Sequence, residues 1–251
     1  IILFNSFKGK LYISDAPFKL PTAETFSGLQ NYIDGLSKTG FLSAFGWSIF
    51  ITFFSTIVIV LFTAMTGWYI TRSKTKVSTS LYFIFVFSMI VPFQMVMFTM
   101  SKVANMLNLD NPVGLIVLYI GFGAGLSIFM FSGFVKSIPI DIEEAALIDG
   151  CNPIKTFFLI VLPLLKPICI TVAILNVMWI WNDYLLPSLV LKSDYKTIPM
   201  AVQYLRGGYG AIDMGAMMAV LVLAIIPIII FYLTCQKYII EGVAAGAVKG
   251  E

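Results

Sequence analysis

The sequence contains no histidine and only three cysteines among its 251 residues. Without histidine, serine and cysteine nucleophiles lack their usual base, and histidine-ligated metal sites are excluded. The cysteines, Cys151, Cys169 and Cys235, are odd in number and widely spaced. We interpret them as small apolar residues rather than a disulfide framework. We therefore expect no catalytic residues and no metal site in this chain.

Charge is also scarce, because charged residues make up 12% of the chain while hydrophobic residues make up 59%. The mean hydropathy is +0.94, which is too apolar for a soluble domain of this size. The net charge of +3 comes without a basic run or an acidic tail, so nucleic acid is not expected as a partner. The composition predicts an all-α, polytopic helical membrane protein embedded in a lipid bilayer.

Long runs without charge predict the membrane spans, since a hydrocarbon core of ~30 Å needs about 20 apolar residues in a helix. The expected spans cover residues 45–70, 77–101, 111–135 and 214–236, which carry no charge, and residues 167–191, which Asp183 interrupts. Residues 1–7 are predicted to be the end of a first, truncated span, which makes six; a clipped signal peptide is disfavoured. Pro92 should bend the second run, and Gly121 and Gly125 predict close helix packing.

A polar insertion, EEAALIDGCNPIKTFFLIVLPLLKP, occupies residues 143–167 between two apolar runs. Pro139 suits the first position of a short helix whose acidic first turn is favoured by the helix dipole. Gly150 predicts the end of that helix, and Asn152 with Pro153 predicts the start of another. One face of the first helix is small or apolar. A short helix without a core of its own requires a partner, so we expect this face to contact another protein.

Seven residues in this stretch follow the spacing EAA, three residues, G, nine residues, IxLP: Glu144, Ala145, Ala146, Gly150, Ile160, Leu162 and Pro163. This pattern resembles the EAA loop of bacterial ABC importer permeases. The resemblance implies the type I ABC importer permease fold, in which residues 136–166 form a cytoplasmic coupling loop that docks on an ATPase subunit. The implied contact residues are Glu144, Ala145, Ala146, Asp149 and Gly150.

Two further segments resemble sugar-importer permeases of this group. They are TFSGLQNYIDGL at residues 25–36 and the ending Q-x₅-G-x₃-GAVKG at residues 236–250. The chain is most similar to the second, shorter permease of the maltose-type branch, which carries di- and oligosaccharides. We accordingly expect an external loop at residues 8–44, a permease core at residues 45–250 and a cytoplasmic tail at residues 237–251.

The resemblance also implies partners and a location. The partners would be a second homologous permease in a heterodimer, two ATPase subunits and an extracytoplasmic sugar-binding protein, in the plasma membrane of a bacterium. ATP and Mg²⁺ would be bound by the ATPase, because the Gly-Lys-Ser/Thr sequence of a P-loop is absent near Gly246 and Lys249. The implied mechanism is alternating access, with no cofactor bound by this chain.

Candidate pathway residues cluster before the second polar segment. The W-N-D pattern among them resembles the fifth span of the family. A PxQ sequence earlier in the chain adds Gln94. The candidates are Gln94, Asn176, Trp179, Trp181, Asn182 and Asp183. Aromatic faces and amide or carboxylate oxygens suit the apolar ring faces and hydroxyls of a sugar. Asp183 is equally compatible with an interfacial aromatic belt. Tyr204 and Tyr209, in the loop at residues 192–213, are candidate contacts for the binding protein.

The orientation of the chain in the membrane cannot be decided by counting basic residues, because lysine and arginine divide equally between the two sides of this topology. The short basic cluster Arg72, Lys74 and Lys76 favours its own side as cytoplasmic. An ion-coupled secondary transporter is the main alternative, although it would need buried ionisable residues, and only Asp183 comes close to membrane depth. An intramembrane enzyme is disfavoured by the missing acid-base pairs.

Overall fold

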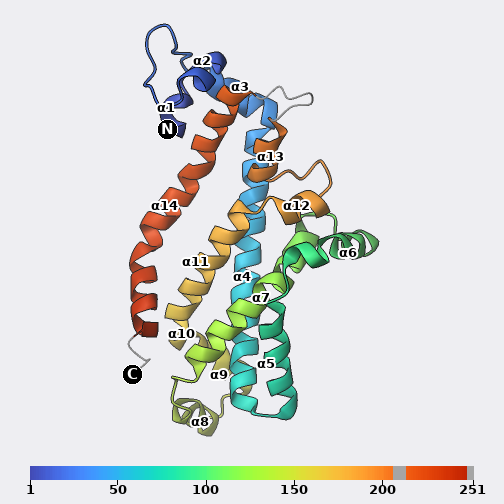
Figure 1. Cartoon of the computed structure of the whole chain (residues 1–251). Coiled ribbons are helices and arrows are strands. Elements are labelled where there is room, and N and C mark those ends of the chain that lie inside the picture. Colours follow the sequence, from blue (N-terminus) through green and yellow to red (C-terminus); the bar gives the residue numbers. More distant parts are fainter. Residues whose placement is uncertain (206–212, 248–251) are drawn as a thin grey trace.

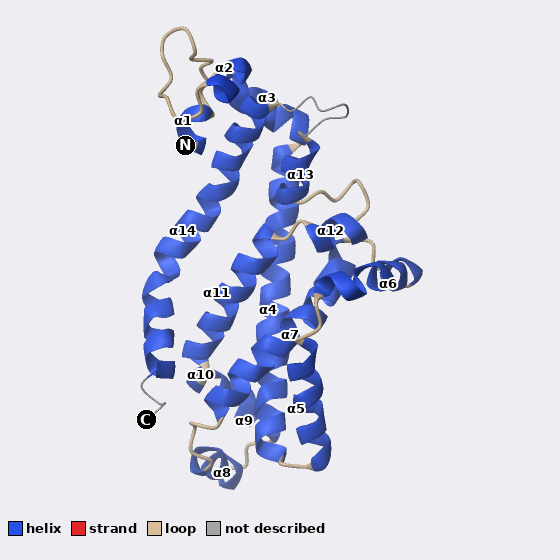
Figure 2. Ribbon diagram, in the orientation of Figure 1, coloured by secondary structure: helices blue, strands red, loops and turns tan. Residues whose placement is uncertain are grey.

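The long apolar runs form long helices in the computed structural model, which describes residues 1–205 and 213–247 (Figure 1). The helices are α1 (Ile2–Asn5), α2 (Lys10–Asp15), α3 (Gln30–Thr39), α4 (Phe41–Ser73), α5 (Lys76–Ser88), α6 (Phe93–Met106), α7 (Pro112–Val135), α8 (Asp141–Ile148), α9 (Pro153–Thr156), α10 (Leu162–Leu164), α11 (Lys166–Asn182), α12 (Leu185–Val190), α13 (Ile198–Tyr204) and α14 (Met214–Ala247), with a π-helical turn η1 (Phe157–Val161) between α9 and α10. No β-strand forms within the described ranges (Figure 2). The predicted all-α fold is confirmed.

Among the described residues, three helices are long and apolar enough to cross a membrane. They are Phe41–Ser73 with 33 residues, Pro112–Val135 with 24, and the Met214–Lys237 part of α14 with 24. The expected spans at residues 45–70, 111–135 and 214–236 are thereby confirmed as helices. α4 and α7 approach closely, since a Cβ added at Gly67 of α4 would lie 2.8 Å from the Cβ of Phe131 in α7.

The two glycines of α7 that were expected to mediate packing differ. A Cβ at Gly125 would lie 2.7 Å from Ser88 Oγ of α5, so glycine permits this contact. A Cβ at Gly121 would meet no atom within 4 Å. Within this chain the packing prediction is correct for Gly125 and wrong for Gly121, because the two residues, although four apart, do not face the same neighbour.

Two other stretches are broken helices. α5 and α6 meet at 105°, and residues Pro153–Leu164 meet Lys166–Asn182 at 78°. The bend expected at Pro92 is present, but it is a break in the helix, because α5 ends at Ser88 and Pro92 adopts an extended conformation before α6 begins. Figure 1 shows α6 directed away from α5. If each broken pair is one span, the described residues contain up to five spans.

The segment expected to be an external loop, residues 8–44, contains two complete helices. α2 and α3 lie at one end of the molecule, where α3 packs against α14 and α4. Gly40 ends α3 with φ +60°, and α4 begins directly afterwards at Phe41. The helical boundary therefore lies earlier than the one expected at residue 45, because a left-handed glycine allows one helix to follow another without a linker.

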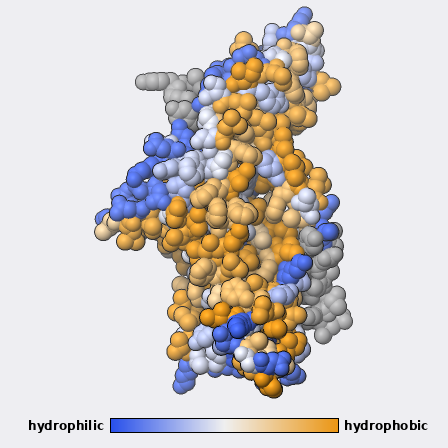
Figure 3. Space-filling model, turned by 180° about the vertical axis from the view of Figure 1, so that it is seen from behind, coloured by the Kyte–Doolittle hydropathy of each residue, from blue (hydrophilic) through white to orange (hydrophobic). Residues whose placement is uncertain are grey.

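The molecule is elongated, with distinct ends. The α8 end contains α8, α9 and the adjoining ends of α4, α5 and α7, while the α3 end contains α1, α2, α3, α13 and the start of α14 (Figure 1). Hydrophobic side chains cover most of the middle of the face shown in Figure 3. A buried cluster near the α8 end, which includes Phe131, Val135, Phe157 and Val161, joins α7 to η1. This core holds the α8 region against the long helices.

Candidate functional site

The predicted coupling loop contains a short helix, a turn and a second helix at the α8 end. α8 begins at Asp141 with Ile140 as its N-cap, and all three acidic residues of its first turn lie where the helix dipole favours them. The expectation that Pro139 occupies the first helical position is wrong, because Pro139 precedes the N-cap. The amide of Ser137 still bonds to a carbonyl of α7, so the chain must leave α7 before α8 can start.

Gly150 ends α8 as predicted. Its φ is +83°, in the left-handed region that glycine adopts readily and other residues rarely do. The amide of Gly150 donates to Leu147 O at 3.0 Å, and the amide of Cys151 donates to Ala146 O at 2.9 Å. This pair of bonds is a Schellman motif, which satisfies carbonyls at the end of the helix. The turn direction is therefore fixed by local hydrogen bonds.

The second helix also starts where the sequence predicts. Asn152 Oδ1 accepts from the amide of Lys155 at 2.8 Å, and Pro153 occupies the first turn. The helix then widens into the π-helical turn η1 just before Pro163. Proline removes a backbone donor and crowds the preceding turn, and a π-bulge is a common accommodation in functional helices.

α8 exposes most of its predicted contact residues. Glu144, Ala145, Asp149 and Gly150 are exposed. Ala146 is not, because it is buried against the protein itself, so its expected place on the outward surface is corrected. The most exposed apolar side chain of α8 is that of Ile148, which is 87% exposed.

A largely buried ion pair attaches α8 to α4. Arg72 Nη2 and Nε donate to Glu143 Oε1 at 2.8 and 2.9 Å, and Trp68 Nε1 donates to Glu143 Oε2 at 2.9 Å. Arg72 Nη2 also donates to Ile138 O at 2.8 Å. The Trp68 ring lies 5.5 Å from that of Phe157 in η1. We call Trp68, Arg72 and Glu143 the clamp; both oxygens of its carboxylate are held by α4.

Sequence reasoning missed the clamp. It assigned Arg72 to membrane orientation and Glu143 to the helix dipole, and it did not consider Trp68. The sequence did contain a signal for this ion pair. Arg72 directly follows a charge-free run, and it is an arginine in a chain whose basic residues are almost all lysine. Arginine is favoured over lysine where a carboxylate is bound through several hydrogen bonds.

Asp183 lies at the junction between α11 and α12, where its carboxylate has partners from its own chain. Oδ2 accepts from the hydroxyl of Tyr119 at 3.0 Å, and Oδ1 accepts from the amide of Leu185 at 2.9 Å. The exposed Trp179 ring packs edge-on against Tyr119 at 5.4 Å, and the exposed Asn182 is adjacent. Trp179 and Asp183 thus both contact Tyr119, while the Nδ2 of Asn182 donates to Met178 O at 2.7 Å.

The other pathway candidates do not join this group. Asn176 is buried, and its Nδ2 donates to Val172 O at 2.8 Å and Ser127 Oγ at 3.3 Å. Trp181 donates to Ala224 O at 3.3 Å and lines an apolar cavity of about 240 Å³ between α4, α11 and α14. Gln94 is exposed on α6. The structure therefore does not bring all six candidates together, because helical spacing turns consecutive residues to different faces.

The two candidate contacts for a binding protein fall at the edge of the described structure. Tyr204 is the last residue of α13, and Tyr209 lies outside the described residues.

Comparisons with known proteins agree on one class. The family described as "Binding-protein-dependent transport system inner membrane component" matches residues 59–244. The chain is 40% identical over 250 residues to a "Probable starch degradation products transport system permease protein" of Thermoanaerobacterium thermosulfurigenes, covering 99% of this chain and 90% of that one. It is 36% identical to a "Multiple sugar-binding transport system permease protein" of Streptococcus mutans, with the same coverages.

A solved structure is also similar. It is described as a bacterial ABC transporter involved in the import of the acidic polysaccharide alginate, and it matches with a TM-score of 0.78 and 25% identity over 94% of this chain and 88% of that one. None of these relatives supports an ion-coupled transporter.

Proposed function

Because this chain belongs to the family of binding-protein-dependent transport system inner membrane components, it is a permease subunit of an ABC importer of sugars, and we propose that α8 is its contact with the ATPase. The chain resides in the inner membrane of a bacterium, where its long helices lie in the bilayer. Its own role is transport, and we propose that ATP and Mg²⁺ are bound by two separate ATPase subunits.

The observation that carries this proposal is the construction of α8. The helix exposes Ile148, Ala145 and Glu144 at the far end of the molecule, while the clamp connects its inner face to α4. An exposed short helix suits a groove on a partner. A partner that moves α8 would move α4 with it, since buried hydrogen bonds join the two. The α8 end would then face the cytoplasm.

We further propose that the sugar passes near Trp179, Asn182 and Asp183. Trp179 offers an aromatic face and Asn182 an amide, both exposed, which suits a ligand with apolar ring faces and many hydroxyls. Further relatives named for melibiose, raffinose and stachyose and for arabinooligosaccharides favour a di- or oligosaccharide. A second homologous permease would complete the pathway, and an extracytoplasmic binding protein would deliver the sugar to the loop at residues 192–213.

A co-purification experiment tests the contact at α8. The tagged chain is extracted from native membranes with mild detergent, and the recovered ATPase subunit is quantified for wild type, Ile148→Asp and Leu20→Asp. Leu20 is a matched control, because it is exposed and apolar but lies between α2 and α3, at the other end of the molecule. We expect Ile148→Asp to reduce both ATPase recovery and sugar uptake, while Leu20→Asp retains the ATPase.

Two outcomes would contradict the proposal. Wild-type chain recovered without any ATPase would contradict the assembly, and equal ATPase recovery from both variants would contradict the contact at α8. Sugar uptake that depends on an ion gradient but survives ATP depletion would contradict the mechanism as a whole.

A further inference from the structure

A second polar feature lies beside the clamp, in a cavity of about 450 Å³ between the ends of α4, α5 and α7. We call it the basic cavity. Three of its lining residues are cations, Arg72, Lys74 and Lys136, and none of its described lining residues is acidic. The volume falls in the roughly 300–1,000 Å³ range of small-molecule sites. Neither the proposed ATPase contact nor the proposed sugar pathway uses this cavity.

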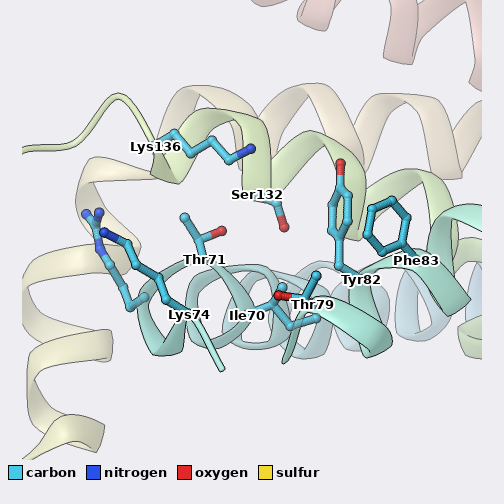
Figure 4. Close-up of a pocket in the computed structure, with 9 residues that line it drawn as sticks. Ile70, Thr71, Lys74, Thr79, Tyr82, Phe83, Ser132 and Lys136 are labelled. Carbon is cyan, nitrogen blue, oxygen red and sulfur yellow. The ribbon is translucent and has the colours of Figure 1, made fainter. Parts of the chain in front are cut away.

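The charges in the basic cavity are not all compensated. Arg72 is paired with Glu143 in the clamp. Lys74 and Lys136 form no ion pair within the described ranges of the chain. Figure 4 shows the Lys136 side chain extending above Ser132 and Thr71, and Lys74 near the opposite wall. Two positive charges therefore border one concave space, which concentrates a positive potential there.

A buried hydroxyl provides the second, independent observation. Ser132 is 2% exposed, and its Oγ has no hydrogen-bond partner among the described residues. The neighbouring hydroxyls are satisfied locally, since Thr71 donates to Gly67 O and Thr79 donates to Thr75 O. Figure 4 shows the Ser132 hydroxyl directed from α7 into the cavity. A buried donor without a partner is uncommon and costs free energy, and a ligand in the cavity would satisfy it.

We propose that the basic cavity binds a phosphate group, carried by an anionic phospholipid headgroup or as inorganic phosphate. A phosphate presents several acceptor oxygens, so it can accept from two lysine ammonium groups and a serine hydroxyl at the same time. Basic pockets between helices at a membrane boundary suit anionic headgroups. The exposed Phe83 at the wall would lie beside the acyl region of a lipid.

Binding measurements on the full-length chain in phosphatidylcholine nanodiscs test the proposal. One arm titrates short-chain phosphatidylglycerol and the other titrates inorganic phosphate. The variants are Lys74→Gln/Lys136→Gln, the isolated hydroxyl change Ser132→Ala, and Lys155→Gln/Lys166→Gln. The last pair is the matched control, since it removes the same charge from two exposed lysines of the α8 region.

We expect saturable binding by wild type and an affinity about 30-fold lower for Lys74→Gln/Lys136→Gln, since each lysine near an anionic headgroup contributes about a fivefold effect. The control should bind as wild type, and Ser132→Ala should bind several-fold more weakly at unchanged charge. If Lys74→Gln/Lys136→Gln and Ser132→Ala weaken the binding of phosphatidylglycerol alone, the cavity is a lipid site. If they weaken the binding of inorganic phosphate, it is a site for free phosphate.

Three results would overturn the proposal: no saturable binding in either arm, equal losses in the two lysine pairs, or wild-type affinity for Ser132→Ala. Equal losses would indicate a general surface charge effect. Unchanged affinity for Ser132→Ala would place the bound group outside the cavity.

Discussion

The two ends of the molecule each contain an ion pair of similar length in a different environment. At the α8 end, Arg72 and Glu143 lie 2.8 Å apart with side chains 19% and 8% exposed. At the α3 end, Lys38 and Asp213 lie 2.6 Å apart with side chains 49% and 29% exposed. We expect the shorter pair to be the weaker one, because exposed charges exchange one polar environment for another. Burial and the number of hydrogen-bond donors, rather than the N–O distance, should decide how much each ion pair contributes to the free energy of folding.

Breaking the clamp should have the largest effect. Glu143→Leu leaves the Arg72 guanidinium mostly buried without its carboxylate, and the loss of one partner of a buried pair costs about 3–5 kcal/mol. We expect this decrease in the free energy of unfolding, measured by denaturant titration in detergent, together with severely reduced sugar uptake. Arg72→Met should be similarly destabilising.

The double variant Arg72→Met/Glu143→Leu sharpens the test. It removes both charges, so it should be more stable than either single variant, yet uptake should stay low because α8 is no longer joined to α4 by directional bonds. Normal uptake by the double variant would show that α8 does not need the clamp to move with α4.

Substitution of Asp183 should have a smaller effect than breaking the clamp, because its carboxylate is only half-buried and accepts from Tyr119 and Leu185. Asp183→Ala should cost about 1–3 kcal/mol, since it leaves the hydroxyl of Tyr119 and a backbone amide without their acceptor. Asp183→Asn preserves the shape and one acceptor oxygen, so its stability should remain within about 1 kcal/mol of wild type. Unfolding and uptake kinetics are measured on the same preparations.

The asparagine variant separates two roles for Asp183. Altered uptake or sugar selectivity at unchanged stability indicates that the carboxylate faces the sugar. Wild-type uptake by Asp183→Asn, with a defect only in Asp183→Ala, indicates that Asp183 acts solely by holding the junction between α11 and α12.

The sequence predicted the local structure around Gly150 well because the signals there are local. Gly150, Asn152 and Pro153 act on backbone groups within a few residues, so their pattern alone predicts the turn and the next helix start. Arg72 and Glu143 are 71 positions apart, and hydropathy does not reveal which distant charges meet.

The break at Pro92 shows the same limit for helices. Apolar length predicted that residues 77–101 are helical, but the 105° angle between α5 and α6 depends on how each helix packs against its neighbours. The pathway candidates were scattered for a related reason, since consecutive residues at the end of α11 face different helices. The basic cavity likewise depends on three helix ends that only the fold brings together.

Gly150 tests whether backbone geometry at the α8 end matters as much as its charges. A Cβ at Gly150 or at Gly133 would meet no atom within 4 Å, but only Gly150 has a positive φ. Gly150→Ala should therefore lose about 1–2 kcal/mol from the left-handed conformation alone, whereas Gly133→Ala, within α7, should be neutral or slightly stabilising. Equal unfolding free energies for the two variants would exclude strain at the turn.

The same turn should affect transport. Gly150→Val adds a β-branched side chain that resists the left-handed conformation. We expect this variant to enter the membrane but to show impaired uptake, because the outward residues of α8 would be redirected. Normal uptake would mean that the partner tolerates a different turn.

The smallest effect should come from the exposed pair at the α3 end. Burial alone would raise the pKa of Asp213, but the Lys38 ammonium and the amide of Ala216 outweigh it and hold that pKa below its usual value. The Asp213 carboxylate in turn raises the pKa of Lys38. A lowered acid pKa stabilises the fold above the unfolded value of about 3.9, and a raised lysine pKa stabilises it below about 10.4.

The Lys38–Asp213 pair should therefore contribute only between about pH 4 and pH 10, and by less than about 1 kcal/mol. Comparing wild type, Lys38→Gln, Asp213→Asn and the double variant at pH 7 isolates the coupling free energy. We expect that coupling to decline as the pH falls through the pKa of Asp213 and to weaken in high salt. A coupling as large as that of Arg72 with Glu143, or one insensitive to salt, would contradict the view that burial rather than distance separates the two ends.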